Sequence, residues 1–463
     1  MPRPAPHTPN LDSVTTINAD GSRYFIHPAD VRGRWTFLRR ASGLLLIAVY
    51  AALPWIRING QPAVFLDVAH RQFHFFGFTL APQDLWLLFF MITGLGFSLF
   101  LVTALSGRIW CGWACPQTVF LDHVFRRIER WLEGDGPARR ALDAAPWTPG
   151  KAFRRILKHA IYLLFSLAIA HLFLAYFVSL PNLYEMARHA PAQHWGAFLF
   201  VMALSGLLYF NFAWFREQFC IVLCPYGRLQ SALIDDHSVV IGYDEKRGEP
   251  RGKATDPANG DCIDCRRCIQ VCPTGIDIRQ GLQLECIGCS NCIDACDQIM
   301  DRLQRPRGLI RYDSLNGFAG RVTRLFRPRI LVYGLLLALG TAAFGLSLTR
   351  LRTATISVTR MPGSAFYEEQ GTLRNQFMVR ILNKLAQPTA VTVTASAAAL
   401  PELRAIGFES EMAIGPRAEI QRPLIVTLPS AAWRGAGTLQ ITFTRADGKV
   451  IETKTMPLLG PDR

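Results

Sequence analysis

Five long runs of apolar residues dominate the pattern of the chain. They cover approximately residues 41–56, 85–105, 160–180, 195–215 and 330–348. A membrane-spanning helix needs about 20 mostly apolar residues, and the last four runs contain no Asp, Glu, Lys or Arg. The first run is the weakest, because it is short and carries Pro54. A buried helix of a soluble protein can imitate one such run but not five, so we predict a multi-domain membrane protein with about five transmembrane α-helices.

The pattern changes after residue 349. Short segments rich in Val, Ile and Thr alternate between apolar and polar positions, which is typical of half-buried strands. These segments are Thr355–Thr359, Gln376–Leu382, Thr389–Ser396, Ile420–Leu428, Thr438–Thr444 and Val450–Thr455. Asp447 and Gly448 precede the last segment and favour a hairpin turn. We therefore predict a C-terminal immunoglobulin-like β-sandwich, which has no cysteine and is expected to act as a binding or docking module.

Basic residues are distributed unevenly between the predicted loops. The chain has 50 Lys and Arg against 35 Asp and Glu, a net charge of +15. Lys and Arg number 6 in residues 1–40, 2 in 57–84, 10 in 106–159, 1 in 181–194 and 17 in 216–329. Because cytoplasmic loops are enriched in Lys and Arg, this alternation predicts a cytoplasmic N-terminus and a tail on the outer side of the membrane. Topology and contact with membrane lipid account for the positive charge, so we expect no nucleic-acid partner.

Eight of the twelve cysteines form two runs with the same spacing. Each run reads Cys-x-x-Cys-x-x-Cys-x-x-x-Cys, and Pro273 follows the first run where Asp297 follows the second. The spacing is typical of a bacterial ferredoxin with two 4Fe–4S clusters, in which the fourth cysteine of each run binds the other cluster. A zinc site would need only one quartet. We therefore expect one cluster on Cys262, Cys265, Cys268 and Cys296, and the other on Cys286, Cys289, Cys292 and Cys272.

The remaining four cysteines form two matching pairs. Cys111 and Cys115 precede Pro116, and Cys220 and Cys224 precede Pro225, so both pairs read Cys-x-x-x-Cys-Pro shortly after an apolar run. If the helix continues through the motif, both sulfurs lie on one face, and the proline is expected to end the helix. Four thiolates brought together suit Cu(I), another iron–sulfur centre or a redox dithiol. Arg108, Arg216 and Arg228 are expected to favour the thiolate forms. Burial as small helix-packing residues is the plainer alternative.

These features divide the chain into five predicted parts. They are a cytoplasmic N-terminal segment over 1–40, a membrane domain with four helices over 41–240, a cytoplasmic α+β two-cluster ferredoxin domain over 241–328, a fifth transmembrane helix over 329–349, and a periplasmic β-sandwich over 350–463. Two clusters at ferredoxin spacing carry single electrons. Phosphate-binding and dinucleotide-binding glycine motifs are absent from the sequence, which argues against ATP hydrolysis and direct NAD(P)H binding.

Three histidines are further candidates for a cofactor or substrate site. His70 and His74 lie four residues apart in a predicted outer loop, and His171 lies within the third apolar run. Such residues serve haem, quinol or copper sites, but we favour a structural role for each of them. Asp122 and His123 are expected to be solvated positions of a cytoplasmic helix.

The layout resembles the FixG/RdxA/CcoG family of cytochrome c oxidase accessory proteins over nearly the whole chain. The resemblance rests on the apolar runs, the paired Cys-x-x-x-Cys-Pro motifs, the two ferredoxin runs and the β-rich tail. It implies a bacterial inner-membrane protein that assists assembly of cbb3-type cytochrome c oxidase and reduces Cu(II) to Cu(I) for its copper centre. Its partners would be oxidase subunits or copper-delivery proteins and an unidentified electron donor. The implied copper site is Cys111, Cys115, Cys220 and Cys224.

Two other functions fit the same sequence. The membrane part also resembles NapH-type quinol dehydrogenase subunits, in which case His70, His74 or His171 would lie near a quinone. The third candidate is a non-catalytic scaffold whose β-domain docks the oxidase.

Overall fold

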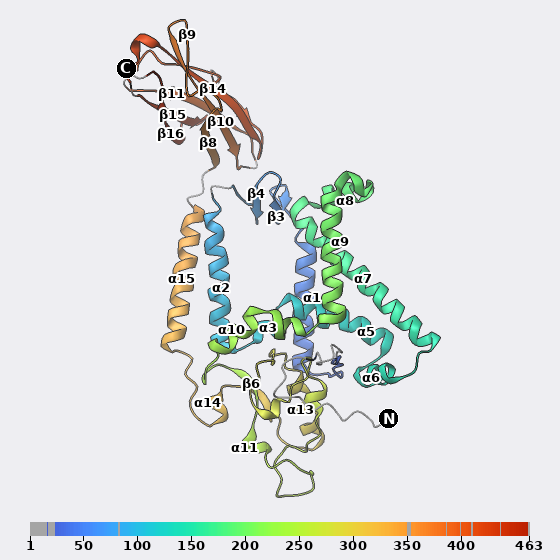
Figure 1. Ribbon diagram of the computed structural model, residues 1–463. Helices are drawn as coiled ribbons and strands as arrows, with labels where there is room; N and C mark the ends of the chain where they lie inside the picture. Colours follow the sequence, from blue (N-terminus) through green and yellow to red (C-terminus); the bar gives the residue numbers. More distant parts are fainter. Residues whose placement is uncertain are drawn as a thin grey trace. The chain divides into compact units, whose positions relative to one another are not determined.

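A computed structural model describes residue 16 and residues 24–81, 84–349, 353–385, 387–398, 400–408, 411–435 and 437–461. The chain divides into two compact units (Figure 1). The first contains residues 1–56, 64–67 and 89–342, and the second contains residues 57–63, 68–88 and 343–463.

Four helices among the described residues are long and apolar enough to cross a membrane. They are α2 (Trp86–Ser106), α7 (Pro149–Val178), the segment Pro191–Phe215 that contains α9 (Trp195–Phe210), and α15 (Pro328–Thr349). At most a third of each apolar window is buried within the protein. Apolar side chains so widely exposed need a lipid environment. Four of the five predicted spans are thus confirmed as membrane-type helices.

The first predicted span lies in α1 (Arg34–Ala52), which ends just before Pro54. Leu44 and Leu45 are 59% and 64% exposed on this helix. Arg34, Arg39 and Arg40 occupy its first two turns, so α1 is not among the four helices above.

The N-terminus of α1 is capped by a residue that is distant in sequence. The cap position is Gly33, which has no side chain to accept a hydrogen bond. The carboxylate of Asp294 accepts instead from the backbone N–H of Trp35 at 3.2 Å and of Thr36 at 2.6 Å. A carboxylate there also interacts favourably with the helix dipole. Asp294 belongs to α13 (Asn291–Arg302), so the start of α1 is tied to the cysteine-rich part of the chain.

Several short helices follow α2 and α7. They are α3 (Ile109–Trp113), α4 (Pro116–Phe120), the π-helical turn Leu121–Phe125, α5 (Arg126–Glu133), α6 (Gly136–Ala144) and, after α7, α8 (Leu180–Arg188). Figure 1 shows α7 beside α9, and the two helices pack together. The rings of Phe125 and Phe212 stack at 4.3 Å, with Tyr162 edge-on to Phe125.

The two cysteine runs lie in a small α+β fold. Its strands β6 (Val240–Tyr243) and β7 (Ile310–Asp313) pair antiparallel, with Val240 opposite Asp313. The helices are α11 (Glu245–Gly248), α12 (Arg267–Gln270), the 3₁₀ turn Ile278–Gln280, α13 and α14 (Leu315–Phe318). Its apolar core is built from Ile241, Ile276, Ile293 and Met300.

The tail is a sandwich of two antiparallel sheets, as predicted. One sheet has the order β12-β14-β10-β8, with β9 also paired to β10, and the other has the order β13-β11-β15-β16. The strands are β8 (Ala354–Arg360), β9 (Tyr367–Glu369), β10 (Thr372–Asn383), β11 (Thr389–Ser396), β12 (Arg404–Ile406), β13 (Met412–Ile414), β14 (Glu419–Pro429), β15 (Gly437–Arg445) and β16 (Val450–Leu458). Phe377, Phe443 and Trp433 fill the core between the sheets.

The second unit also contains a hairpin of β4 (Gln72–Phe75) and β5 (Phe78–Leu80). Asp84, which follows this hairpin, forms an ion pair with Lys384 of the segment after β10. The remaining short strands are β1 (Arg57–Ile58), β2 (Gln61–Pro62) and β3 (Val64–Asp67).

Candidate redox site

The ferredoxin cysteines line two neighbouring cavities. One cavity is lined by Cys262, Cys265, Cys268 and Cys296. The other is lined by Cys272, Cys286, Cys289 and Cys292, with Cys268 between the two. In each cavity three cysteines come from one run, and the fourth position of the other run completes the set. This is the grouping that crossed ligation of two clusters requires.

The two runs share one backbone geometry. In the first run Asp264 and Arg266 have positive φ angles of 51° and 56°. In the second run Gly288 and Ser290, at the same two positions of the spacing, have φ angles of 68° and 66°. Left-handed residues at these positions turn the chain tightly. The turns direct three successive thiols of each run into one cavity.

The chemistry of these thiols fits an iron–sulfur cluster. Burial raises the pKa of Cys268, Cys289 and Cys296 to about 12. Such thiols keep their protons at neutral pH unless a metal replaces the proton. Soft sulfur ligands in sets of four suit a 4Fe–4S cluster, which supplies single-electron transfer when bound.

The Cys-x-x-x-Cys-Pro motifs are breaks between helices, so the condition of one helix continuing through each motif is not met. Cys111 lies in α3, and Cys220 lies in a π-helical turn (Phe219–Leu223). Cys115 and Cys224 are extended cap residues, with ψ angles of 126° and 111°. Each proline then begins a new helix, α4 or α10 (Pro225–Leu233), because proline is well suited to the first helical position. The two motifs therefore share one geometry.

The four motif thiols lie close enough to influence one another's ionisation. Burial raises the pKa of Cys111, Cys115 and Cys220, and repulsion from the other motif thiols adds to the effect. Arg108 opposes the shift but does not overcome it, so the expected thiolate forms are not favoured. Arg216 is instead buried against Glu129 and Glu217, and the side chain of Arg228 lies outside the described residues.

A resident mononuclear site is not formed by these side chains. In the described part of the chain, no group of three or more His, Cys, Asp or Glu side chains is arranged to hold one metal ion. The same is true of the ferredoxin cysteines.

The first motif lies directly against the second ferredoxin run. Cys111, Ile287 and Cys289 form one buried apolar cluster. The indole Nε1 of Trp113 donates a hydrogen bond to the carbonyl oxygen of Gly288 at 3.1 Å. Arg39 lies near Cys289 and donates from its Nε to the carbonyl oxygen of Gly112 at 2.7 Å. The first Cys-x-x-x-Cys-Pro motif therefore packs directly against Cys289, which is an expected cluster ligand.

The candidate histidines have local partners. The Nδ1 atom of His171 is 2.8 Å from the carbonyl oxygen of Leu167 in its own helix. His74 is buried, with its Nδ1 atom 2.9 Å from the Thr79 hydroxyl, whereas His70 is exposed.

Asp122 is not a solvated position, which corrects the expectation from the sequence. Its side chain is only 11% exposed and pairs with Arg39 and with Arg126. Burial alone would raise the pKa of Asp122, but the two guanidiniums hold it well below its usual range. His123 is half-buried beside it. A carboxylate on a helix face gives no sign in sequence that two arginines will enclose it.

Comparisons with known proteins match the same parts of the chain. Family models match residues 215–315 as a 4Fe–4S dicluster domain, 84–134 as a 4Fe–4S binding domain, and 344–461 as the immunoglobulin-like fold at the C-terminus of FixG. The nitrogen fixation protein FixG of Rhizobium meliloti is 35% identical, over 89% of this chain and 88% of its own. Proteins RdxA and RdxB of Cereibacter sphaeroides are 34% and 36% identical, over 77% and 80% of this chain and 79% and 82% of their own.

Among solved structures, a FixG-related protein from Vibrio parahaemolyticus aligns with 24% of this chain and 97% of its own, with 15% identity and a TM-score of 0.22. The family models place all twelve cysteines in segments that match iron–sulfur domains.

Proposed function

The chain belongs to the FixG and RdxA family of membrane-bound iron–sulfur electron-transfer proteins, and on this premise we propose that it reduces Cu(II) to Cu(I) during assembly of a cbb3-type cytochrome c oxidase. Copper is the substrate in this proposal. A bound cluster would supply one electron to Cu(II) and would itself be oxidised by one electron, and Cu(I) would be released.

The observation that carries the proposal is the contact of Cys111 with Ile287 and Cys289. Cys289 is an expected ligand of one cluster, and Cys111 belongs to the expected copper site. An electron that leaves this cluster therefore reaches the membrane motif through packed atoms, without another carrier.

The four motif cysteines supply the chemistry at the copper end. Soft sulfur ligands stabilise Cu(I) over Cu(II) and so favour the reduction. In this proposal the motif thiols hold copper transiently and then pass it on. Gln230 accepts a hydrogen bond from the Cys111 thiol at 3.4 Å and another from Arg108 at 2.5 Å, which orients this thiol.

The test is the double substitution C111S/C115S in the chain with its clusters loaded. We expect loss of Cu(II) reduction while the EPR signals of the two reduced ferredoxin clusters remain. The cluster signals are an internal control for folding. Full reductase activity in C111S/C115S contradicts the proposal.

The proposed location is the bacterial cytoplasmic membrane, with the N-terminus and the ferredoxin domain inside and the β-sandwich outside. The Lys and Arg distribution supports it. A protease added to intact spheroplasts is expected to remove the β-sandwich and leave the ferredoxin domain protected. The same β-sandwich is the surface we propose for oxidase subunits or copper-delivery proteins.

A further inference from the structure

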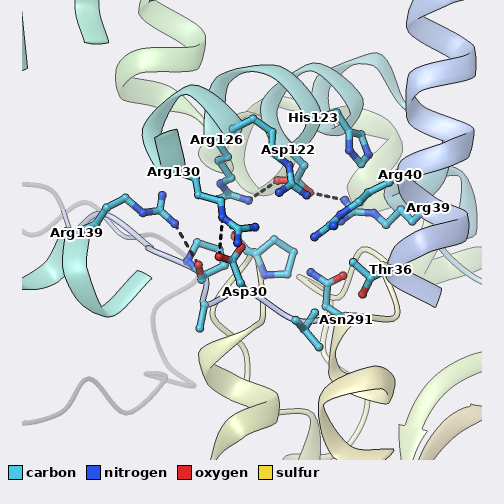
Figure 2. A pocket seen from close by; sticks show the side chains of 15 residues that line it. Asp30, Thr36, Arg39, Arg40, Asp122, His123, Arg126, Arg130, Arg139 and Asn291 are labelled. Atoms are coloured by element: carbon cyan, nitrogen blue, oxygen red, sulfur yellow. Dashed lines mark hydrogen bonds and ion pairs between the residues drawn. The ribbon is translucent and has the colours of Figure 1, made fainter. Parts of the chain in front are cut away.

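A cationic pocket lies where α1, α5 and the ferredoxin fold meet (Figure 2). Its volume is about 80 Å³, several times what one water needs. Six arginines line it: Arg39, Arg40, Arg126, Arg127, Arg130 and Arg139. The lining carboxylates are Asp30 and Asp122. The charge of this pocket is therefore strongly positive.

Four of the six guanidiniums have carboxylate partners. Arg39 and Arg126 pair with Asp122, Arg130 pairs with Asp30 at 2.9 Å, and Arg139 pairs with Glu129 behind the pocket at 2.6 Å. Burial lowers the pKa of His123 to about 4, so its ring adds no charge at neutral pH.

Arg40 and Arg127 are different. Neither forms an ion pair with a carboxylate in the described part of the chain, and the Nε of Arg40 is buried without a hydrogen-bond partner. Burial, followed by repulsion from neighbouring guanidiniums, lowers the pKa of both side chains. Two like charges held together in a partly buried pocket are unfavourable unless an anion joins them.

We propose that this pocket binds a phosphate group, with Arg40 and Arg127 as its principal ligands. Guanidinium groups donate paired hydrogen bonds that match phosphate oxygens. The phosphate belongs either to the headgroup of an anionic membrane lipid or to a small soluble molecule. Clusters of basic residues next to a membrane are known to attract anionic headgroups.

The position of the pocket gives its occupant an influence on one cluster. Pro273, which lines the pocket, directly follows Cys272, and Asn291 directly precedes Cys292. Cys272 and Cys292 are expected ligands of the same cluster. Net charge near a cluster helps to set its reduction potential. A bound phosphate makes addition of an electron harder, so occupancy lowers the potential of this cluster.

The test uses the full chain with both clusters loaded, purified in a neutral detergent. Inorganic phosphate is titrated into lipid-depleted protein by calorimetry. Native mass spectrometry of undepleted protein measures retained phosphatidylglycerol against phosphatidylcholine. We expect R40Q/R127Q to weaken binding by about 100-fold, about tenfold for each guanidinium. The matched control is R302Q/R321Q, which removes two exposed arginines outside the pocket.

R40Q/R127Q relieves a repulsion, so it is expected to fold with both clusters, as the cluster absorbance will show. R40K/R127K, which keeps the charge but not the paired donors, is expected to bind with intermediate affinity. If R40Q/R127Q no longer binds inorganic phosphate in the calorimeter, the natural ligand is a soluble phosphate compound. If R40Q/R127Q no longer retains phosphatidylglycerol, the natural ligand is a lipid headgroup. Either result supports the proposal.

Three results overturn it. The first is that the unsubstituted chain binds neither ligand. The second is that R40Q/R127Q binds as well as R302Q/R321Q. The third is that the potential of the cluster, measured by redox titration, is the same with and without the bound ligand, which removes the proposed influence on electron transfer.

Discussion

A β-carbon placed on Gly112 would lie 2.5 Å from the carbonyl oxygen of Ile287. The same atom would lie 3.0 Å from the Cα of Cys289. Real β-carbons do not approach backbone atoms this closely, so only glycine permits the present contact. The first Cys-x-x-x-Cys-Pro motif and the second ferredoxin run therefore meet backbone to backbone.

We expect Gly112→Ala to separate these two backbones. Overpacking of this kind costs about 1–3 kcal/mol, and the longer path should slow electron transfer from the clusters to Cu(II). Stopped-flow absorbance of the pre-reduced clusters mixed with Cu(II) measures the rate. Gly96→Ala is the matched control, because a β-carbon on Gly96 meets nothing within 4 Å. Equal rates in the two variants would show that this contact is not on the electron path.

Crossed ligation predicts which cluster each single substitution affects. Cys272→Ser should perturb the cluster expected on Cys286, Cys289 and Cys292, although Cys272 belongs to the other run. Cys296→Ser should perturb the cluster expected on the first run. EPR of the reduced proteins, with iron analysis, distinguishes the two clusters. A loss confined to the cluster of the same run would contradict the crossed assignment.

Glu129→Gln is expected to destabilise the first compact unit by about 3–5 kcal/mol, because it removes the negative charge of Glu129 from a buried network of ion pairs. Glu129 accepts from Arg139 at 2.6 Å, from Arg216 at 3.0 Å and from the Tyr162 hydroxyl at 2.9 Å. A lowered thermal midpoint in detergent measures the effect. Glu245→Gln, at an exposed position, serves as the control and should leave the midpoint unchanged.

The same carboxylate predicts a dependence on pH. Burial alone would raise the pKa of Glu129, but Arg216 and Arg139 hold it well below its ordinary value of 4.5. The folded state then binds this proton less readily than the unfolded state, so its contribution to stability is complete above about pH 4.5 and is lost as the pH falls. Thermal midpoints measured from pH 5 down to about pH 3 should fall less steeply in Glu129→Gln than in the unsubstituted chain.

Phe377→Ala should destabilise the β-sandwich by about 3–5 kcal/mol, because Phe377 is fully buried between its sheets. Urea unfolding of the excised domain, residues 350–463, followed by circular dichroism measures the loss. Tyr367→Ala, at an exposed aromatic residue, is the control. An insoluble domain would show instead that the β-sandwich needs the rest of the chain.

Much of the fold is predictable from the sequence, because the spacing of apolar residues along the chain indicates where its helices and strands lie. The segment predicted as Thr389–Ser396 is strand β11 with the same bounds. Four apolar runs are membrane-type helices. The sequence left open whether one helix continues through Cys111 and Cys115, because proline is compatible with both the end of one helix and the start of the next. Only the surrounding packing selects between the two.

The sequence predicts which cysteines belong to the site, but it does not predict which of them lie next to one another in space. Spacing indicates that Cys262 and Cys265 serve one cluster, yet nothing in it indicates that Cys111 will touch Cys289. Counting basic residues likewise predicts topology but not the pocket around Arg40 and Arg127. Contacts between residues more than 70 positions apart depend on how the helices pack, and local patterns do not contain that information.

The cap on α1 also has a consequence for the order in which the protein is made. Because α1 is synthesised long before Asp294, the backbone N–H groups of Trp35 and Thr36 lack this hydrogen-bond acceptor until Asp294 has been added to the chain and has folded into place. Asp294 lies on α13 between Cys292 and Cys296, two expected cluster ligands. Cofactor insertion is then expected to complete the first turn of α1, and in a chain starved of iron the N-terminal end of this helix is expected to fray and become open to proteases.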